Sequence, residues 1–303
     1  MDFNLSVAPR VAEALAVGQP VVALESTIIS HGLPWPQNLE CALELEALLE
    51  AEDVVPATVA VLGGQPTVGL DRAALEHLAQ GRAVAKASRR DLARVMAARQ
   101  DGATTVAATM VLAARAGIPL FATGGIGGVH RGAAQSFDIS ADLTELARTP
   151  VAVVCAGAKS VLDLPRTLEV LETHGVPVVG YGTERFPAFY IRETELEIPR
   201  LDEPGEVARL IHHQRQLDLG GLVVTVPIPG EEALAAEVVE GWIQAALGEV
   251  AEAHIQGPAV TPYLLRRLDE LSVGRVVRAN LALVRNNVRV AAAIARSLAT
   301  LEG

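Results

Sequence analysis

The chain of 303 residues contains 50% hydrophobic and 20% charged residues, which excludes a disordered protein and suffices for a large core. Its formal net charge of −11, without any basic run, argues against binding to nucleic acid or to an anionic membrane. No apolar run approaches the roughly 20 residues that span a bilayer, and the first residues show no basic targeting signal. The two cysteines, Cys41 and Cys155, are not spaced for a disulfide framework or a thiolate zinc site, so we expect a cytoplasmic protein.

Apolar segments rich in β-branched residues alternate with helix-like segments along most of the chain. The predicted strands span residues 21–25, 58–62, 120–124, 151–157, 176–181 and 222–227. The predicted helices between them span residues 37–50, 71–78, 91–98, 104–116, 161–173 and 204–216. After residue 230 the strand signal stops, and helices are predicted over residues 231–247, 262–271 and 280–298.

This alternation predicts an α/β fold with a mainly parallel sheet, covered by helices on both faces. We expect one domain over residues 1–303 with a helical C-terminal portion. Periodicity does not distinguish an open three-layer sandwich from a closed barrel. In both, ligands bind beyond the carboxyl ends of the strands, which brings Glu25, residues 123–125 and Lys159 to one edge of the sheet.

Lysine is rare in this chain, because the 25 basic residues are 23 arginines and two lysines, Lys86 and Lys159. Arginine replaces lysine on a surface but not as a nucleophile or Schiff-base former, since guanidinium stays protonated. Lys159 follows a buried strand through a glycine turn, and we expect it at the start of the next helix. Apolar neighbours and the positive end of a helix dipole both favour an uncharged amine, so Lys159 is a candidate nucleophile. A surface lysine at a turn is the alternative.

Glu25 ends the first apolar strand, where apolar surroundings raise the pKa of a carboxyl group, as a general acid near neutral pH requires. A capping or ion-pairing role beside Ser26 and Thr27 is the alternative. The densest glycine run, residues 123–132, lets the backbone approach an anion closely. It does not match the dinucleotide-binding spacing, because His130 stands where the third glycine belongs.

His130, Asp138 and Asp142 lie in or after this glycine run. A helix is predicted to begin near Ser140, which leaves Asp138 on the preceding loop. A loop carboxylate suits a hard divalent ion such as Mg²⁺ or Mn²⁺, whereas Asp142 is equally explained as a complement to the helix dipole. A glycosidase that uses paired carboxylates also fits these residues.

Lys86 is followed by Arg89 and Arg90, which places three cations within five residues. Such a cluster near residues 102–106 suits a phosphate monoester. The solvated start of a helix explains the same spacing.

Several longer strings carry a resemblance to a known family. They are ESTIISHGLP at residues 25–34, GATTV at 102–106, FATGGIGGVHR at 121–131, CAGAKS at 155–160 and NLALVRNN at 280–287. With them the chain resembles the pseudouridine-5′-phosphate glycosidases, the family that includes the indigoidine-cluster A proteins, over roughly residues 20–295. The resemblance implies a three-layer α/β/α sandwich and a homotrimer. It also implies reversible cleavage of the C–C glycosidic bond of pseudouridine 5′-phosphate to uracil and D-ribose 5-phosphate.

The resemblance further implies a role for each matching position. Lys159 is implied to be the nucleophile that forms an imine with C1′ of the opened ribose, Glu25 the proton donor, and Asp138 the ligand of one Mn²⁺ per subunit. The positions implied to contact substrate are Lys86, the Val106 backbone, Ser140, Ala141, Asp142, Thr123, His130 and Asn280.

Two other functions remain open at this level. One is a class I aldolase-type lyase that uses Lys159 on another phosphosugar, and the other is a non-catalytic binding subunit. The chain also departs from the family pattern after Tyr190, where Ile191-Arg192 stands in place of the usual Ser-Gly.

Overall fold

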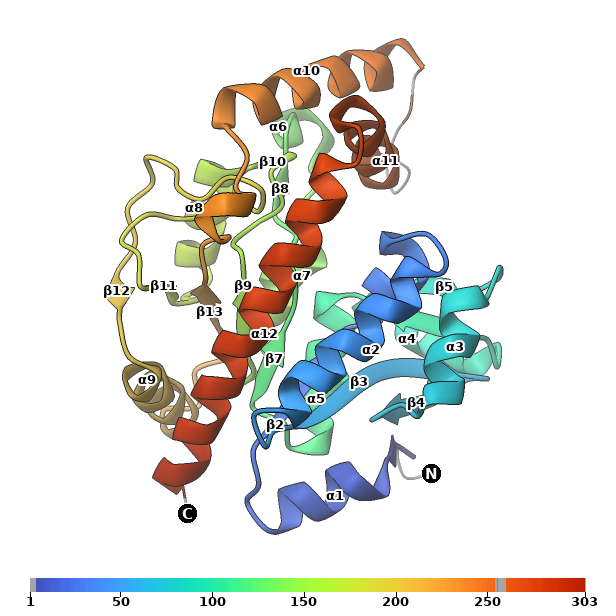
Figure 1. Cartoon of the computed structure of the whole chain (residues 1–303), viewed down its shortest axis with the longest axis vertical. Helices are drawn as coiled ribbons and strands as arrows, with labels where there is room; N and C mark the ends of the chain where they lie inside the picture. The colour runs from blue at the N-terminus through green and yellow to red at the C-terminus, as the bar shows by residue number, and fades with distance from the viewer. Residues whose placement is uncertain (1–3, 254, 256–259, 303) are drawn as a thin grey trace.

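The structure of the chain is a computed structural model that describes residues 4–253, 255 and 260–302 (Figure 1). One large sheet runs through the molecule. Its strand order is β1 (Ser6–Val7), β4 (Gln65–Val68), β3 (Val55–Leu62), β2 (Val21–Leu24), β7 (Leu120–Ala122), β9 (Ala152–Cys155), β13 (Leu222–Thr225), β11 (Val178–Tyr181) and β12 (Arg200–Leu201). The outer strands β1 and β12 each pair with a single neighbour on this path, so the sheet is open and not a barrel.

The centre of the sheet is parallel, from β3 through β2, β7, β9 and β13 to β11. The short strands β5 (Ala85–Ala87) and β6 (Gly102–Thr104) extend it beside β3, where β4 and β6 pair antiparallel to that strand. A separate two-stranded ribbon joins β8 (Val129–His130) to β10 (Leu162–Asp163). The central strands are buried on both faces, which explains their continuous apolar sequences.

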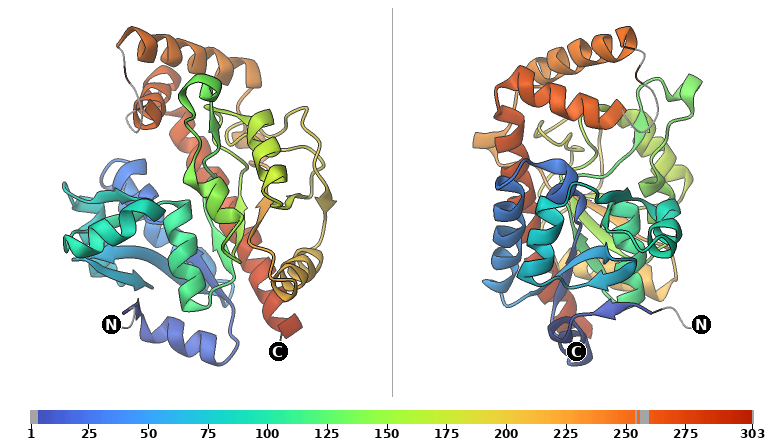
Figure 2. Two further views of the ribbon diagram at one scale, coloured as in Figure 1. Left: turned by 180° about the vertical axis from the view of Figure 1, so that it is seen from behind. Right: turned by 90° about the vertical axis from the view of Figure 1, so that its right-hand side faces the viewer.

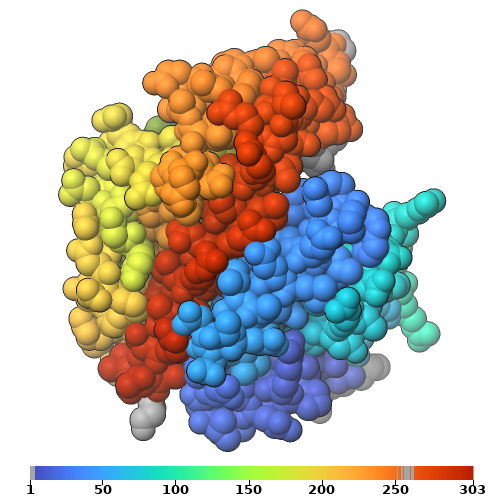
Figure 3. All heavy atoms as spheres, viewed as in Figure 1, coloured from blue at the N-terminus to red at the C-terminus, as the bar shows by residue number. Residues whose placement is uncertain are grey.

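Helices cover the sheet on both faces, which makes the three-layer α/β/α arrangement. Along the chain they are α1 (Pro9–Ala16), α2 (Gln37–Glu50), α3 (Arg72–Gln80), α4 (Leu92–Ala97), α5 (Val106–Ala116), α6 (Ala133–Ser136), α7 (Ala141–Leu146), α8 (Leu164–Thr173), α9 (Pro204–Gln216), α10 (Ala236–Glu252), α11 (Val260–Ser272) and α12 (Arg275–Glu302). Figures 1 and 3 show α12 and α2 side by side on one face, and the left view of Figure 2 shows α5 and α7 on the other. The predicted fold class is therefore confirmed.

The predicted elements are present, with shifted ends. The predicted helix bounds at 37–50 and 204–216 match the structure, whereas α10 begins only at Ala236, after a 3₁₀ turn at Gly230–Glu232. The helix predicted from residue 161 begins at Leu164, because residues 162–163 form β10 instead.

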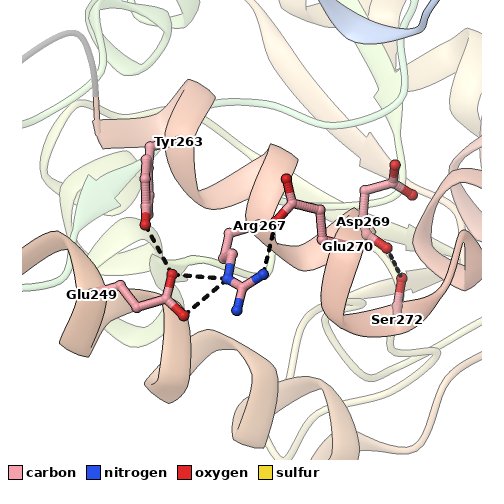
Figure 4. A network of polar contacts seen from close by, with 6 residues as sticks. All are labelled: Glu249, Tyr263, Arg267, Asp269, Glu270 and Ser272. Atoms are coloured by element: carbon pink, nitrogen blue, oxygen red, sulfur yellow. Dashed lines mark hydrogen bonds and ion pairs between the residues drawn. The ribbon is translucent and has the colours of Figure 1, made fainter.

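The helical C-terminal portion consists of α10, α11 and α12. Glu249 on α10 accepts hydrogen bonds from the Tyr263 hydroxyl at 2.8 Å and from Arg267 Nε at 2.8 and 2.9 Å, which ties α10 to α11 (Figure 4). Arg267 also pairs with Glu270 on its own helix at 2.7 Å. Among the described residues, no helix is both long enough and apolar enough to cross a membrane.

Helix α12 is the longest helix described, with 28 residues, and it contacts β2, β7 and β9 as well as α2 and α9. Its buried positions recur every three or four residues, which is the spacing of one helical face. The face begins at Val276, Ala279 and Leu283 and continues through Asn287 to Leu298. Asn287 is the polar residue within this buried face, and it lies against the end of β7.

Candidate active site

Glu25 follows the last residue of β2, at the carboxyl edge of the central strands. Thr123, which follows β7, donates a hydrogen bond from its hydroxyl to Glu25 Oε1. Burial raises the pKa of Glu25 and the negative charge of Asp142 adds to this, although Lys159, Thr123 and Lys86 act in the opposite direction. A carboxyl group with a raised pKa retains its proton to higher pH, as a general acid must.

Lys159 follows β9 at the same edge, in the loop between β9 and β10. Gly157 turns the chain there with φ = +76°, and a Cβ at this position would collide with the carbonyl of Pro187. The Lys159 N–H donates to the carbonyl of Ile126 at 3.2 Å, which pins the loop to the glycine run. The prediction that a helix starts at Lys159 is wrong, because β10 separates Lys159 from α8. Lys159 therefore does not lie at the positive end of the α8 dipole.

A short segment, residues 186–191, packs over this loop. The Ser160 hydroxyl donates to the carbonyl of Ala188 at 2.6 Å, and the Phe189 N–H donates to the carbonyl of Ala156 at 2.9 Å. The Phe189 ring lies so close to Gly125 that a Cβ there would approach Cδ2 to 2.6 Å. The close approach explains why glycine is needed at this point of the run.

Asp142 joins the glycine run to the start of α5. Its Oδ1 accepts the N–H of Ala107 at 3.0 Å and its Oδ2 accepts the N–H of Gly127 at 2.8 Å. Ser140 caps α7 through a hydrogen bond from the Asp142 N–H, so α7 begins where the sequence predicted. Asp142 therefore lies in the first turn of α7, as predicted, and in addition holds the backbone around Val106, the first residue of α5.

Lys86 lies in β5, next to β6, and much of its side chain faces solvent. The neighbouring protein nevertheless desolvates the amine and lowers the pKa of Lys86, and the positive charge of Lys159 lowers it further. His31 belongs to the same surroundings, since partial burial and then the charge of Lys86 lower the pKa of His31. His31 lies within the ESTIISHGLP string, but no local pattern in the sequence predicts a role for it.

Arg89 is not free to bind a phosphate beside Lys86. Its guanidinium pairs with both carboxylate oxygens of Glu145, at 2.6 and 2.5 Å, and Glu145 is completely buried. Arg90 has 82% of its side chain exposed. The three predicted cations therefore do not form one cluster. Of the three, Lys86 is the one whose pKa is influenced by the charges of Lys159, Glu25 and Asp142.

His130 and Asp138 face each other beside the β8–β10 ribbon, with His130 Nδ1 3.8 Å from Asp138 Oδ2. Burial lowers the pKa of His130, and the charges of Lys159 and Lys86 lower it further, against the effect of Asp138. Asp138 has 41% of its side chain exposed and lies on the loop before α7, as predicted. Within the part of the chain that the structure describes, no three His, Cys, Asp or Glu side chains gather as a metal cluster.

Asn280 on α12 lies at the same edge, since a Cβ added to Gly124 would be 3.4 Å from Asn280 Oδ1. Ala141 is the exposed first residue of α7. The interactions of Glu25 thus place it near Lys159, Lys86, Thr123 and Asp142 at one edge of the sheet. The charges of Lys159 and Asp138 act on His130 in turn. A cavity of about 620 Å³ lies between α1, α2 and α3, and it shares no residue with this edge.

Comparison with known proteins places the chain in a family. The family described as "Indigoidine synthase A like protein" matches residues 10–297, and the chain belongs to it. Relatives from Solibacter usitatus and Paracoccus denitrificans are each 54% identical over 98% of this chain and cover 100% and 99% of their own lengths. Both are named pseudouridine-5′-phosphate glycosidase, which confirms the resemblance, and the chain is an enzyme of this C-glycosidic lyase class.

Two solved structures share the fold over nearly their whole length. The prealnumycin C-glycosynthase AlnA in complex with ribulose 5-phosphate has a TM-score of 0.93 and 39% identity, and covers 100% of this chain and 99% of its own. An indigoidine synthase A-like protein from Thermotoga maritima has a TM-score of 0.90 and 33% identity, and covers 99% of this chain and 98% of its own.

Proposed function

We propose that this enzyme reversibly cleaves the C–C glycosidic bond of pseudouridine 5′-phosphate to give uracil and D-ribose 5-phosphate. The observation that carries the proposal is that Glu25, a carboxyl group of raised pKa, lies near enough to Lys159 at one edge of the sheet for the charge of Lys159 to act on it. The names of the relatives support the substrate. AlnA, which is 39% identical to this chain, binds ribulose 5-phosphate, and this supports a pentose phosphate as the sugar part of the substrate.

A C-glycoside needs both groups, because its leaving carbon has no lone pair to protonate. In our proposal the Lys159 amine bonds to C1′ as the C1′–O4′ bond breaks, and the proton that the nitrogen then loses goes to O4′. The nitrogen lone pair then forms a C1′=N iminium as the C1′–C5 bond breaks, and C5 of uracil takes its proton from Glu25. Water hydrolyses the iminium, which releases ribose 5-phosphate, restores the amine and returns a proton to Glu25.

The remaining predicted positions are assigned to binding. Lys86 supplies a cation for the phosphate, together with backbone N–H groups at Val106 and at the start of α7. His130, Thr123 and Asn280 line the sugar and base.

Asp138 is our proposed ligand for one Mn²⁺ per subunit. A single carboxylate with His130 at 3.8 Å supplies few donors, which suits a hard ion that keeps water or substrate oxygens in its other positions. A bound Mn²⁺ would polarise an oxygen of the substrate. We further propose a homotrimer, for which the mass in solution should be three times the 31.8 kDa of the chain.

The experiment is a borohydride trap with ribose 5-phosphate, followed by peptide mass analysis. Since Lys86 and Lys159 are the only lysines, Lys86→Arg is a matched control in which a trapped side-chain adduct must be on Lys159. We expect the adduct in wild type and Lys86→Arg and its loss in Lys159→Arg, which keeps the charge but not the nucleophile. An adduct without release of uracil from pseudouridine 5′-phosphate would indicate an aldolase-type lyase, and no adduct in wild type would indicate a binding subunit.

A further inference from the structure

Asn287 on α12 is a buried polar group that the proposed function does not use. It is completely buried, within a helix face whose neighbouring positions Leu283 and Ala291 are apolar. Its Nδ2 donates to the carbonyl of Thr123 at 2.8 Å and to the carbonyl of Gly124 at 3.2 Å. A side chain from the last helix therefore holds the backbone at the end of β7.

The orientation of this amide is determined by its partners. Carbonyl oxygens accept hydrogen bonds and cannot donate them, so the NH₂ group of Asn287 must face Thr123 and Gly124. Its Oδ1 is buried and has no hydrogen-bond partner in the described part of the protein. The unpaired acceptor destabilises the fold, whereas the two donated hydrogen bonds stabilise the backbone at the end of β7. The contribution of Asn287 to the structure is therefore concentrated at Thr123 and Gly124.

The backbone that Asn287 holds carries the partner of Glu25. The Thr123 N–H donates to the carbonyl of Val154 on β9 at 3.0 Å, and its carbonyl accepts from Asn287. With the backbone fixed on both sides, the Thr123 hydroxyl is directed at Glu25 Oε1. We propose that Asn287 is a positioning residue that aligns the proton donor Glu25 through Thr123; the proposal rests on the function assigned to Glu25 above.

Through Thr123, Asn287 also influences the pH dependence of the reaction. The Thr123 hydroxyl stabilises the ionised form of Glu25, and so do the charges of Lys159 and Lys86, whereas burial and Asp142 favour the protonated form. A misplaced Thr123 hydroxyl raises the pKa of Glu25. Because Glu25 must be protonated to act, activity is lost as pH rises through its pKa, and this limb of the profile moves to higher pH.

The test measures uracil release from pseudouridine 5′-phosphate as a function of pH in four proteins. They are wild type, Asn287→Leu, Thr123→Val and the control Asn286→Leu, whose wild-type amide donates instead to the carbonyl of Pro227 at 3.2 Å. For Asn287→Leu and Thr123→Val we expect kcat about tenfold lower and the high-pH limb raised by up to about one pH unit. The control keeps the wild-type limb.

A double variant adds a second criterion. If Asn287 acts through Thr123, the high-pH limb of the double variant Thr123→Val/Asn287→Leu should lie at the same pH as that of Thr123→Val alone. Additive shifts, or a wild-type limb in folded Asn287→Leu, would overturn the proposal. Should Asn287→Leu not fold, Asn287→Ala serves with the same expectation. Failure of the proposed function itself is separate, because it would appear as no uracil from wild type or as an active Glu25→Gln variant.

Discussion

Replacing Arg89 by alanine removes the cation that balances a completely buried carboxylate. Both oxygens of Glu145 accept from the Arg89 guanidinium, and the Thr149 hydroxyl donates to Oε1 as well. Removing one partner of a buried ion pair costs about 3–5 kcal/mol, because the remaining charge stays buried without compensation. Arg89 has 47% of its side chain exposed, so water replaces part of what is lost and we expect about 2–3 kcal/mol.

Thermal and urea denaturation measure this effect directly. For a chain of this size, that loss should lower Tm by roughly 3–5 °C. The neighbouring Arg90→Ala is the matched control, because Arg90 is 82% exposed, and it should stay within about 0.5 kcal/mol of wild type. Arg89→Met with Glu145→Leu, which removes both charges, should recover most of the stability. Equal unfolding free energies for Arg89→Ala and Arg90→Ala would refute the reasoning.

Three further predictions concern the site itself. Burial holds the pKa of Glu25 above its usual 4.5, so the stabilisation that this group provides is fully present below pH 4.5 and is lost as pH rises through the raised pKa. In unfolding measurements over a pH series, Glu25→Gln should therefore be more stable than wild type at the alkaline end. A difference in unfolding free energy that stays constant with pH would contradict this. Gly125→Ala should cost about 1–3 kcal/mol and lower kcat, because the new Cβ meets the Phe189 ring, whereas Gly230→Ala, with nothing within 4 Å, should unfold like wild type. Asp138→Asn should weaken Mn²⁺ binding by about tenfold or more in electron paramagnetic resonance titrations, and unchanged binding would remove Asp138 from the metal site.

The sequence predicts well those parts of the fold that local signals mark. Pro204 at the first position of α9 and the apolar strand before Glu25 are examples, because a fixed φ and an apolar run act on their own residues. The rule that ligands lie beyond the carboxyl ends of parallel strands then brings Glu25 and Lys159 together without knowledge of their contacts.

The sequence does not predict which distant side chains pair. Arg89 meets Glu145 across 56 residues, and Asn287 meets Thr123 across 164. An arginine three residues after a lysine, and an asparagine within a helix, are both common at solvent-exposed positions. No local pattern therefore marks Arg89 or Asn287 as a residue with a distant partner. The strand β10 was missed for a related reason, because two residues beside a helical pattern take their conformation from pairing with β8.

The position of α12 has a consequence for synthesis on the ribosome. Strands β2, β7 and β9 emerge long before the helix that covers their front face. Until residues 275–302 leave the exit tunnel, these strands lack the cover that α12 provides, and the nascent chain must avoid aggregation during this interval. Premature termination shortly before α12 should therefore yield an aggregation-prone, protease-sensitive product that remains bound to chaperones.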